Sequence, residues 1–140
     1  MEREQLIAEL HRGGWSCVVS SAEGVVRSFT NRGVADLYGL YRAEPTFACG
    51  GMLADKVIGR GAAALAVALG VVWVYADVVS RPALELLRNN GVEVLYGELA
   101  DNIINRRGDD ICPVERLTMG EERIDLLIER IGQFLDQQQR

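Results

Sequence analysis

The chain has 140 residues, of which 49% are hydrophobic, so it is long enough to form one domain with a sizeable core. Its formal net charge of −5 argues against a nucleic acid polymer as a partner, because phosphate binding needs a basic face. The chain has no apolar run of transmembrane length and no signal-peptide pattern, so we expect no membrane partner. Three widely spaced cysteines are typical of reduced thiols, which predicts a cytoplasmic location.

The first third of the chain is predicted to combine two helices with a β-hairpin and a third strand. Apolar residues recur at helical spacing before Gly13 and again before Pro45, and β-branched runs lie between them. The predicted elements are a helix over residues 2–11, strands over 15–21 and 24–29, a helix over 32–43 capped by Asn31, and a strand over 47–54.

The middle of the chain is predicted to form the core of the fold. Residues 57–69 are apolar or small on every side apart from Arg60, which indicates a helix buried all round. The elements after it are a strand over 71–76, a helix over 80–90 with Ser80 as its N-cap, and a strand over 92–96. Strands and helices that alternate at this spacing predict right-handed crossovers and a parallel part of the sheet.

The last third of the chain is predicted to be irregular until a terminal helix. Residues 98–116 show no clear periodicity, and the charged run 106–110 is typical of a solvated loop. A capping box at Thr118–Glu121 supports a C-terminal helix, which is predicted over residues 116–137. The apolar stripe of that helix either packs on its own domain, taken as residues 1–140, or joins two copies, and we expect a homodimer. The stripe consists of Ile124, Leu127, Ile128, Ile131 and Leu135.

Four short motifs give the chain a family resemblance. They are Ala54–Gly59, Tyr75–Ala83, Ile104-Asn105-Arg106 and Cys112–Glu115. As a set, these motifs resemble an uncharacterised bacterial and archaeal family with a cytidine-deaminase-like fold. The resemblance implies a three-layer α/β/α domain with a mixed five-stranded sheet and deaminase-like topology.

The chain departs from the zinc deaminases at the residues that matter for their chemistry. Val78–Pro82 stands where those enzymes have Pro-Cys-x-x-Cys. The first deaminase motif would fall on Ala54–Lys56 or on Gly59–Gly61, and neither supplies a His or Cys ligand or the proton-shuttling Glu. His11 is the only histidine and is predicted to face solvent. We therefore expect no metal, no cofactor and no zinc-dependent deamination.

The candidate site lies where the predicted strand before the buried helix ends. Lys56 stands there beside Asp55, near helix N–H groups that favour anions; the alternative is a Lys–Asp pair that only closes the strand. Arg60 needs a ligand or an internal partner such as Asp77, because an unpaired buried charge is costly. The full set of predicted ligand-binding residues is Asp55, Lys56, Arg60, Ser80, Asn105, Arg106 and Cys112.

Cys112 and Glu115 supply the other candidate chemistry. Cys112 is either a thiol in the cleft, activated by Arg106 or Lys56 with Glu115 as base or hydrogen-bond acceptor, or a small buried apolar residue before a proline. The candidate catalytic residues are therefore Lys56, Cys112 and Glu115.

We predict that the chain binds a small nucleotide-like or anionic ligand in this cleft. Two other functions stay open: a metal-independent enzyme that uses the candidate catalytic residues, and an interaction protein with a vestigial cleft. Gly59-Arg60-Gly61 also matches a dinucleotide fingerprint, with Asp77 near the place of the ribose-binding acid. The hairpin and helix that precede this motif favour the deaminase-like alternative.

Overall fold

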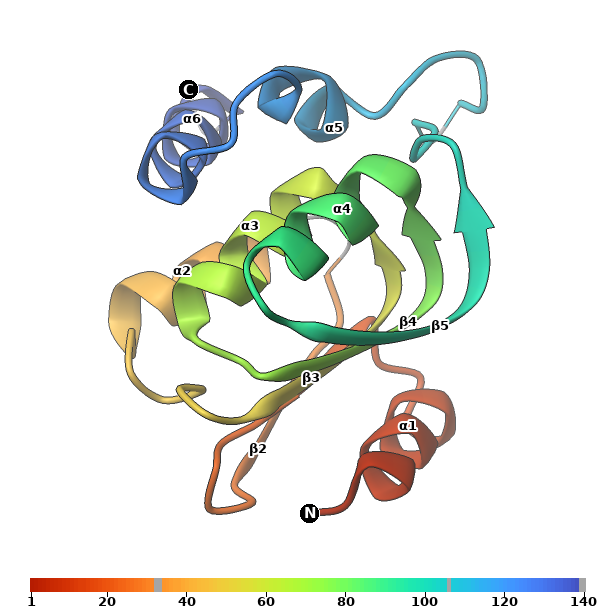
Figure 1. Cartoon of the computed structure of the whole chain (residues 1–140), viewed down its shortest axis with the longest axis vertical. Helices are drawn as coiled ribbons and strands as arrows, with labels where there is room; N and C mark the ends of the chain where they lie inside the picture. Colours follow the sequence, from red (N-terminus) through yellow and green to blue (C-terminus); the bar gives the residue numbers. More distant parts are fainter. Residues whose placement is uncertain (32–33, 106, 139–140) are drawn as a thin grey trace.

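The computed structural model describes residues 1–31, 34–105 and 107–138 and shows a mixed α/β fold (Figure 1). Five strands form one sheet in the order β2-β1-β3-β4-β5. The predicted mixed five-stranded sheet is present: β1 is antiparallel to both of its neighbours, and β3, β4 and β5 are parallel. The strands are β1 (Cys17–Ser20), β2 (Val26–Phe29), β3 (Met52–Ile58), β4 (Trp73–Ser80) and β5 (Glu93–Ala100).

Helices cover both faces of the sheet (Figure 1). The helix α1 (Arg3–Arg12) packs on one face, against β1 and β3. The other face carries α2 (Ala35–Ala43), α3 (Arg60–Leu69) and α4 (Arg81–Asn89). The helices α5 (Pro113–Thr118) and α6 (Ile124–Gln138) lie over the far side of α3, so α3 is enclosed between the sheet and other helices.

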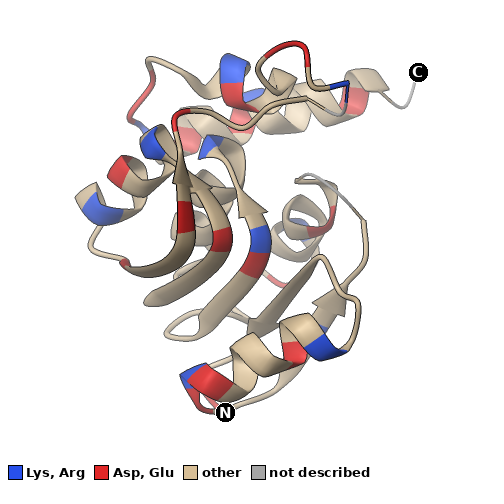
Figure 2. Cartoon of the chain, turned by 90° about the vertical axis from the view of Figure 1, so that its right-hand side faces the viewer, with Lys and Arg blue, Asp and Glu red and all other residues tan. Residues whose placement is uncertain are grey.

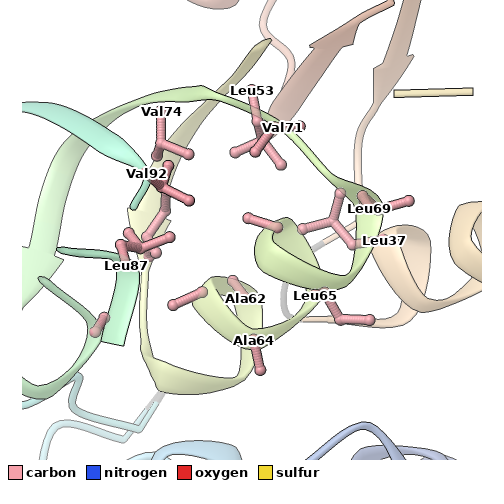
Figure 3. Close-up of a cluster of buried hydrophobic side chains, with 14 of the residues drawn as sticks. Leu37, Leu53, Ala62, Ala64, Leu65, Leu69, Val71, Val74, Leu87 and Val92 are labelled. Carbon is pink, nitrogen blue, oxygen red and sulfur yellow. The ribbon is translucent and has the colours of Figure 1, made fainter. Parts of the chain in front are cut away.

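The main core lies between the sheet and α2, α3 and α4 (Figure 3). The helix α3 is buried along almost its whole length, as predicted, because its alanines let neighbouring elements approach closely. Leu53, Val74 and Leu65 are fully buried within this core. A smaller cluster fills the α1 face, where Leu6 and Leu10 pack against Trp73. The two clusters together fix the sheet between its helical layers.

The third strand lies later in the chain than predicted. The expectation of a strand over 47–54 is wrong, since residues 45–50 form turns and Gly50 has a φ of 76° that continues no strand. The strand instead runs through Val57 and Ile58, which were predicted to open the buried helix. That helix starts after Gly59, whose extended backbone is the N-cap. The charged pair Asp55-Lys56 therefore lies inside the strand, near its end.

Two predicted helix starts are also corrected. Thr118 does not begin a helix: it ends the unpredicted helix α5, where its hydroxyl donates to the carbonyls of Val114 and Glu115, and α6 begins only at Ile124. Asn31 does not cap α2, because its amide donates to Asp36 and the N-cap position belongs to Val34.

The stripe of the terminal helix packs on its own chain. Leu127, Ile128 and Ile131 are buried and belong to the main core. No helix within the described ranges is both long and apolar enough to cross a bilayer.

Candidate functional site

A cleft of about 1080 Å³ opens at the carboxyl end of β3, where the chain turns into α3. It is also lined by residues 103–105, the start of α5 and the last turns of α6. Apolar lining comes from Val34, Ile104 and Phe134. Open α/β sheets commonly bind ligands beyond the carboxyl ends of their strands, so the cleft lies where the sequence predicted a site.

Asp55 is a buried carboxyl in the lining of this cleft. Only 8% of the residue is exposed, and its Oδ1 accepts a hydrogen bond of 3.1 Å from the backbone N–H of Val57. Burial raises the pKa of Asp55 to about 7. Hydrogen bonds from the backbone N–H of Val57, from the thiol of Cys17 opposite it in β1 and from the backbone N–H of Lys56 oppose this rise. Burial and the neighbouring Asp55 in turn raise the pKa of the Cys17 thiol. Asp55 can therefore act as either acid or carboxylate near neutral pH.

Lys56 supplies an exposed cation to the same cleft. Of the fifteen Lys and Arg residues in the sequence, it is the only lysine. The three parallel strands are fully described, and Lys56 is the single cation on them. Figure 2 shows that the other charged residues on these strands are acids. Within the described ranges no carboxylate lies in ion-pair distance of its ammonium group, and the alternative of a Lys–Asp pair is not observed. Lys56 is thus available to an external anion.

Glu115 binds the N-terminus of α3. The residue is only 1% exposed, and its Oε1 accepts from the backbone N–H of Arg60 at 2.8 Å and from Ser80 Oγ at 2.9 Å. Its Oε2 accepts from the backbone N–H of Ile103. The helix terminus predicted to attract a ligand anion therefore already carries an internal carboxylate. Both oxygens of Glu115 accept hydrogen bonds within the chain, which gives this residue a structural role; its catalytic role stays a prediction.

Arg60 and Ser80 do not line the cleft. The guanidinium of Arg60 donates to the carbonyl of Thr118 and to Glu122, the latter at 2.8 Å, so it ties α3 to the connection between α5 and α6. Ser80 is fully buried; besides its bond to Glu115, its Oγ accepts from Ala83 N at 3.2 Å and caps α4 as predicted. Neither residue is part of the cleft lining, and both bind Glu115 instead, so their predicted contact with a ligand has no support from this geometry.

Three further predicted residues come from the segment before α5. Asn105 lines the cleft, and its amide is already engaged with Asp109 at 2.9 Å. Cys112 is half-buried, lines the cleft and occupies the N-cap position of α5 without a side-chain capping bond. Arg106, the other predicted ligand-binding residue, lies outside the described residues. The cleft therefore brings together Asp55, Lys56, Asn105, Cys112 and Glu115.

The glycines of Gly59-Arg60-Gly61 make room for α5. A Cβ on Gly61 would clash with Cγ1 of Val114, and a Cβ on Gly59 would lie 3.4 Å from Glu115 Oε1. The position at which a dinucleotide fingerprint would bring its pyrophosphate is thus filled by residues of the same chain. The spacing of these glycines reflects close packing between α3 and α5.

We expect Gly61→Ala to lower the free energy of unfolding by about 2 kcal/mol, because overpacking against Val114 outweighs the better helix propensity of alanine. Adding Val114→Ala should restore most of this stability. Urea unfolding of the two single variants and the double variant measures the coupling. If Gly61→Ala lowered the free energy of unfolding equally in the wild-type and Val114→Ala backgrounds, the packing role of Gly61 would be contradicted.

A polar cluster on the opposite face of the sheet was not predicted. His11 Nε2 lies 2.7 Å from Asp77 Oδ1, and the hydroxyl of Tyr75 donates to the same oxygen at 2.6 Å. This hydrogen bond raises the pKa of Tyr75 to about 12. Asp77 is therefore not the partner of Arg60 that was predicted. His11 and Asp77 are separated by 66 positions, so no local pattern could reveal their contact.

The fold and the site can be compared with known proteins. A family model described as a domain of unknown function (DUF1893), TM1506, matches residues 5–135. The chain belongs to the DUF1893 family. The crystal structure of a DUF1893 family protein (TM1506) from Thermotoga maritima has a TM-score of 0.85, with 20% sequence identity, 95% of this chain covered and 91% of that chain covered. At this identity, the likeness establishes a shared DUF1893 fold. A search of curated proteins gives no match.

The predicted membership of an uncharacterised family is confirmed by this match. The family description names no activity. Within the described ranges, no three His, Cys, Asp or Glu side chains are grouped as metal ligands would be.

Proposed function

We propose that this DUF1893 protein binds a small ligand with an acidic group and a flat, partly apolar ring, such as a nucleotide-like molecule, in the cleft beside Asp55 and Lys56. The observation that carries this proposal is that one cleft is lined by a buried carboxyl and by a lysine without an ion-pair partner among the described residues. Small-molecule sites typically combine apolar lining with a few polar groups that orient the ligand.

The two charged residues have different roles in this proposal. Lys56 contacts the acidic group of the ligand, because its ammonium is exposed and the helix terminus nearby is already occupied by Glu115. Asp55 contacts the polar edge of the ring. With a pKa of about 7 it offers both a donor and an acceptor when protonated and two acceptors when ionised. A nucleobase-like ring, which presents N–H and carbonyl groups side by side, fits such a partner.

We further propose a deaminase-like topology that works without zinc or another cofactor. The parallel strands β3, β4 and β5, with α3 and α4 between them, follow the order implied by the family resemblance. Glu115 stands between the starts of α3 and α4, where the missing deaminase motifs would fall. The cytoplasmic location also stays a prediction; its support is that all three cysteines are free.

A metal-independent enzyme is the second candidate function. The observation that favours it is Asp55, since a buried carboxyl with a pKa near neutral pH suits general acid–base catalysis. Lys56 and Cys112 line the same cleft and remain candidates, whereas Glu115 is engaged in hydrogen bonds. Asp55 therefore replaces Glu115 as the proposed base.

The binding proposal predicts that Lys56→Ala lowers the affinity for a nucleotide-like ligand by ~tenfold, because a charge-assisted hydrogen bond is lost. A thermal-shift screen of nucleoside monophosphates, nucleobases and small carboxylic acids, run on wild type and variant together, measures this effect. Lys56 is exposed, so the variant alone should change the free energy of unfolding by less than about 0.5 kcal/mol.

Two variants control this experiment. Lys56→Arg keeps the charge and should retain part of the ligand-dependent stabilisation. Arg42→Ala removes an exposed cation from α2, outside the cleft, and should retain all of it. Ligand-dependent stabilisation that is unchanged in Lys56→Ala would refute the assignment of the cation, and no stabilisation by any compound would refute the ligand class.

A further inference from the structure

The strand β5 forms one edge of the sheet and pairs only with β4 among the described residues (Figure 1). It is eight residues long, whereas β2 at the opposite edge has four. Natural proteins protect such edges with short strands, prolines, charged side chains (lysine above all) or covering segments. The sequence of β5 contains no proline and no lysine; its two charged residues, Glu93 and Glu98, flank Leu95, which is 51% exposed. This edge can therefore pair with another strand.

The direction of the backbone groups shows which residues would pair. The N–H of Glu93 donates to Val72 O, so it points toward β4. Backbone groups alternate along a strand, so those of Leu95 also point toward β4 and those of Val94 and Tyr96 point outward. Within the described part of the chain, the outward groups of Val94 and Tyr96 have no backbone partner, so they can bond with a partner strand.

We propose that two copies of this chain pair antiparallel through β5 about a two-fold axis that passes beside Leu95. In this register Leu95 of one copy lies opposite Leu95 of the other, at a position without hydrogen bonds where side chains come closest. Val94 of each copy lies opposite Tyr96 of the other, and these outward backbone groups form two reciprocal pairs of hydrogen bonds. The sheets of the two copies become continuous.

The side chains of β5 are complementary to themselves in this register. Leu95 meets Leu95 on the exposed face, and Val94 meets Tyr96 on the core face, a β-branched and aromatic pair of the kind that stabilises sheets. Glu93 lies opposite Gly97, so no two acids face each other despite the net charge of −5. A symmetric pairing with a closed two-fold axis satisfies both edges and ends there.

The helix α4 adds charge complementarity. It packs against β5, so the two-fold axis also brings two copies of α4 alongside each other in antiparallel directions. Glu85 and Arg88 are exposed on this helix and lie three positions apart. These residues carry opposite charges, so two antiparallel copies of α4 can meet acid to base instead of acid to acid. This surface replaces α6 as the proposed dimer interface, since the middle of the α6 stripe is buried in its own core.

The test is the oligomeric state of variants that introduce a charge at Leu95. Wild type should sediment as a dimer over a range of about 1 to about 100 μM. Leu95→Lys and Leu95→Glu should each raise the dimer dissociation constant by ~tenfold or more, because like charges then meet on the axis. Mixing the two variants should restore a dimer, since opposite charges then meet. Val25→Lys is the matched control: Val25 is 49% exposed in the turn before β2, and its replacement should leave the dimer unchanged.

Each outcome decides the proposal. A circular dichroism spectrum like that of wild type and a cooperative urea transition establish that the Leu95 variants are folded, even though loss of the dimer should lower their urea midpoint. A strictly monomeric wild type, or a dimer that both Leu95 variants leave intact, overturns the proposal. The cleft lies elsewhere on the molecule and none of its lining belongs to β5, so this result does not depend on ligand binding.

Discussion

Replacing Asp55 by Asn should abolish a loss of stability of about 4 kcal/mol that the wild-type protein undergoes between pH ~4 and pH ~7. The pKa of Asp55 is raised from 3.8 to about 7 in the folded protein because the carboxyl is buried. The folded state therefore holds its proton over a range in which the unfolded chain has released it. Ionising Asp55 in the fold costs free energy that asparagine, which keeps an oxygen for Val57 N, does not incur.

The sign of the effect follows from proton binding. Between the two pKa values the folded state binds more protons than the unfolded state, so the free energy of unfolding falls as pH rises. Below pH ~4 both states are protonated, and above pH ~7 both are ionised, so the difference between wild type and Asp55→Asn is constant outside this window. The variant should be the more stable protein at pH ~8.

Urea unfolding of both proteins at several pH values from about 4 to about 8 measures this difference. Comparing the two proteins cancels the contribution of all other carboxylates. Asp101→Asn is the matched control, because the Asp101 side chain is 87% exposed and its replacement should leave the pH profile of the wild type unchanged. Parallel profiles for wild type and Asp55→Asn would show that Asp55 does not titrate near neutral pH.

Elements governed by local patterns were predicted well. The helix after Ser80 has the predicted N-cap, because a serine hydroxyl that accepts from a backbone N–H three residues later is a local contact. The helix α3 was identified because apolar and small residues surround it on every side. Both signals depend on neighbours within a few positions, which a sequence displays directly.

Boundaries that depend on tertiary contacts were not predictable in the same way. Val57 and Ile58 suit a buried helix and a buried strand equally well, and pairing with β4 assigns them to the strand. The helix α5 has only six residues, too few for a periodic signal, and its start at Pro113 was the one local indication. Its position over α3 follows from Gly61 and Glu115, which meet it from distant parts of the chain.

The candidate site shows the same division. Asp55 and Lys56 were predicted as site residues because two adjacent charges interrupt an apolar region, and both line the cleft. The role of Glu115 was not recognised, since its contacts with Arg60 and Ser80 span 55 and 35 positions. An acid within a motif is predicted to have a specific partner. The motif does not show whether the acid meets a ligand or a helix terminus of its own chain.

Glu115 links the fold to the cleft, and its replacement tests that link. Glu115→Gln should lower the free energy of unfolding by about 3 kcal/mol, because the amide nitrogen cannot accept from donors that the carboxylate now satisfies. At least one buried group among Arg60 N–H, Ser80 O–H and Ile103 N–H then loses its acceptor. The expected loss is large because Glu115 is only 1% exposed, so little water reaches these groups.

Urea unfolding measures the global effect, and amide hydrogen exchange of residues 101–123 shows where the variant opens. Exchange should accelerate first in α5, which Glu115 fastens to α3 and α4, while the sheet keeps its protection. Glu129→Gln provides the control, since Glu129 is exposed on α6 and its replacement should cost less than about 0.5 kcal/mol. If Glu115→Gln were as stable as this control, its carboxylate would not fasten α5, and the start of α3 would be open to a ligand anion.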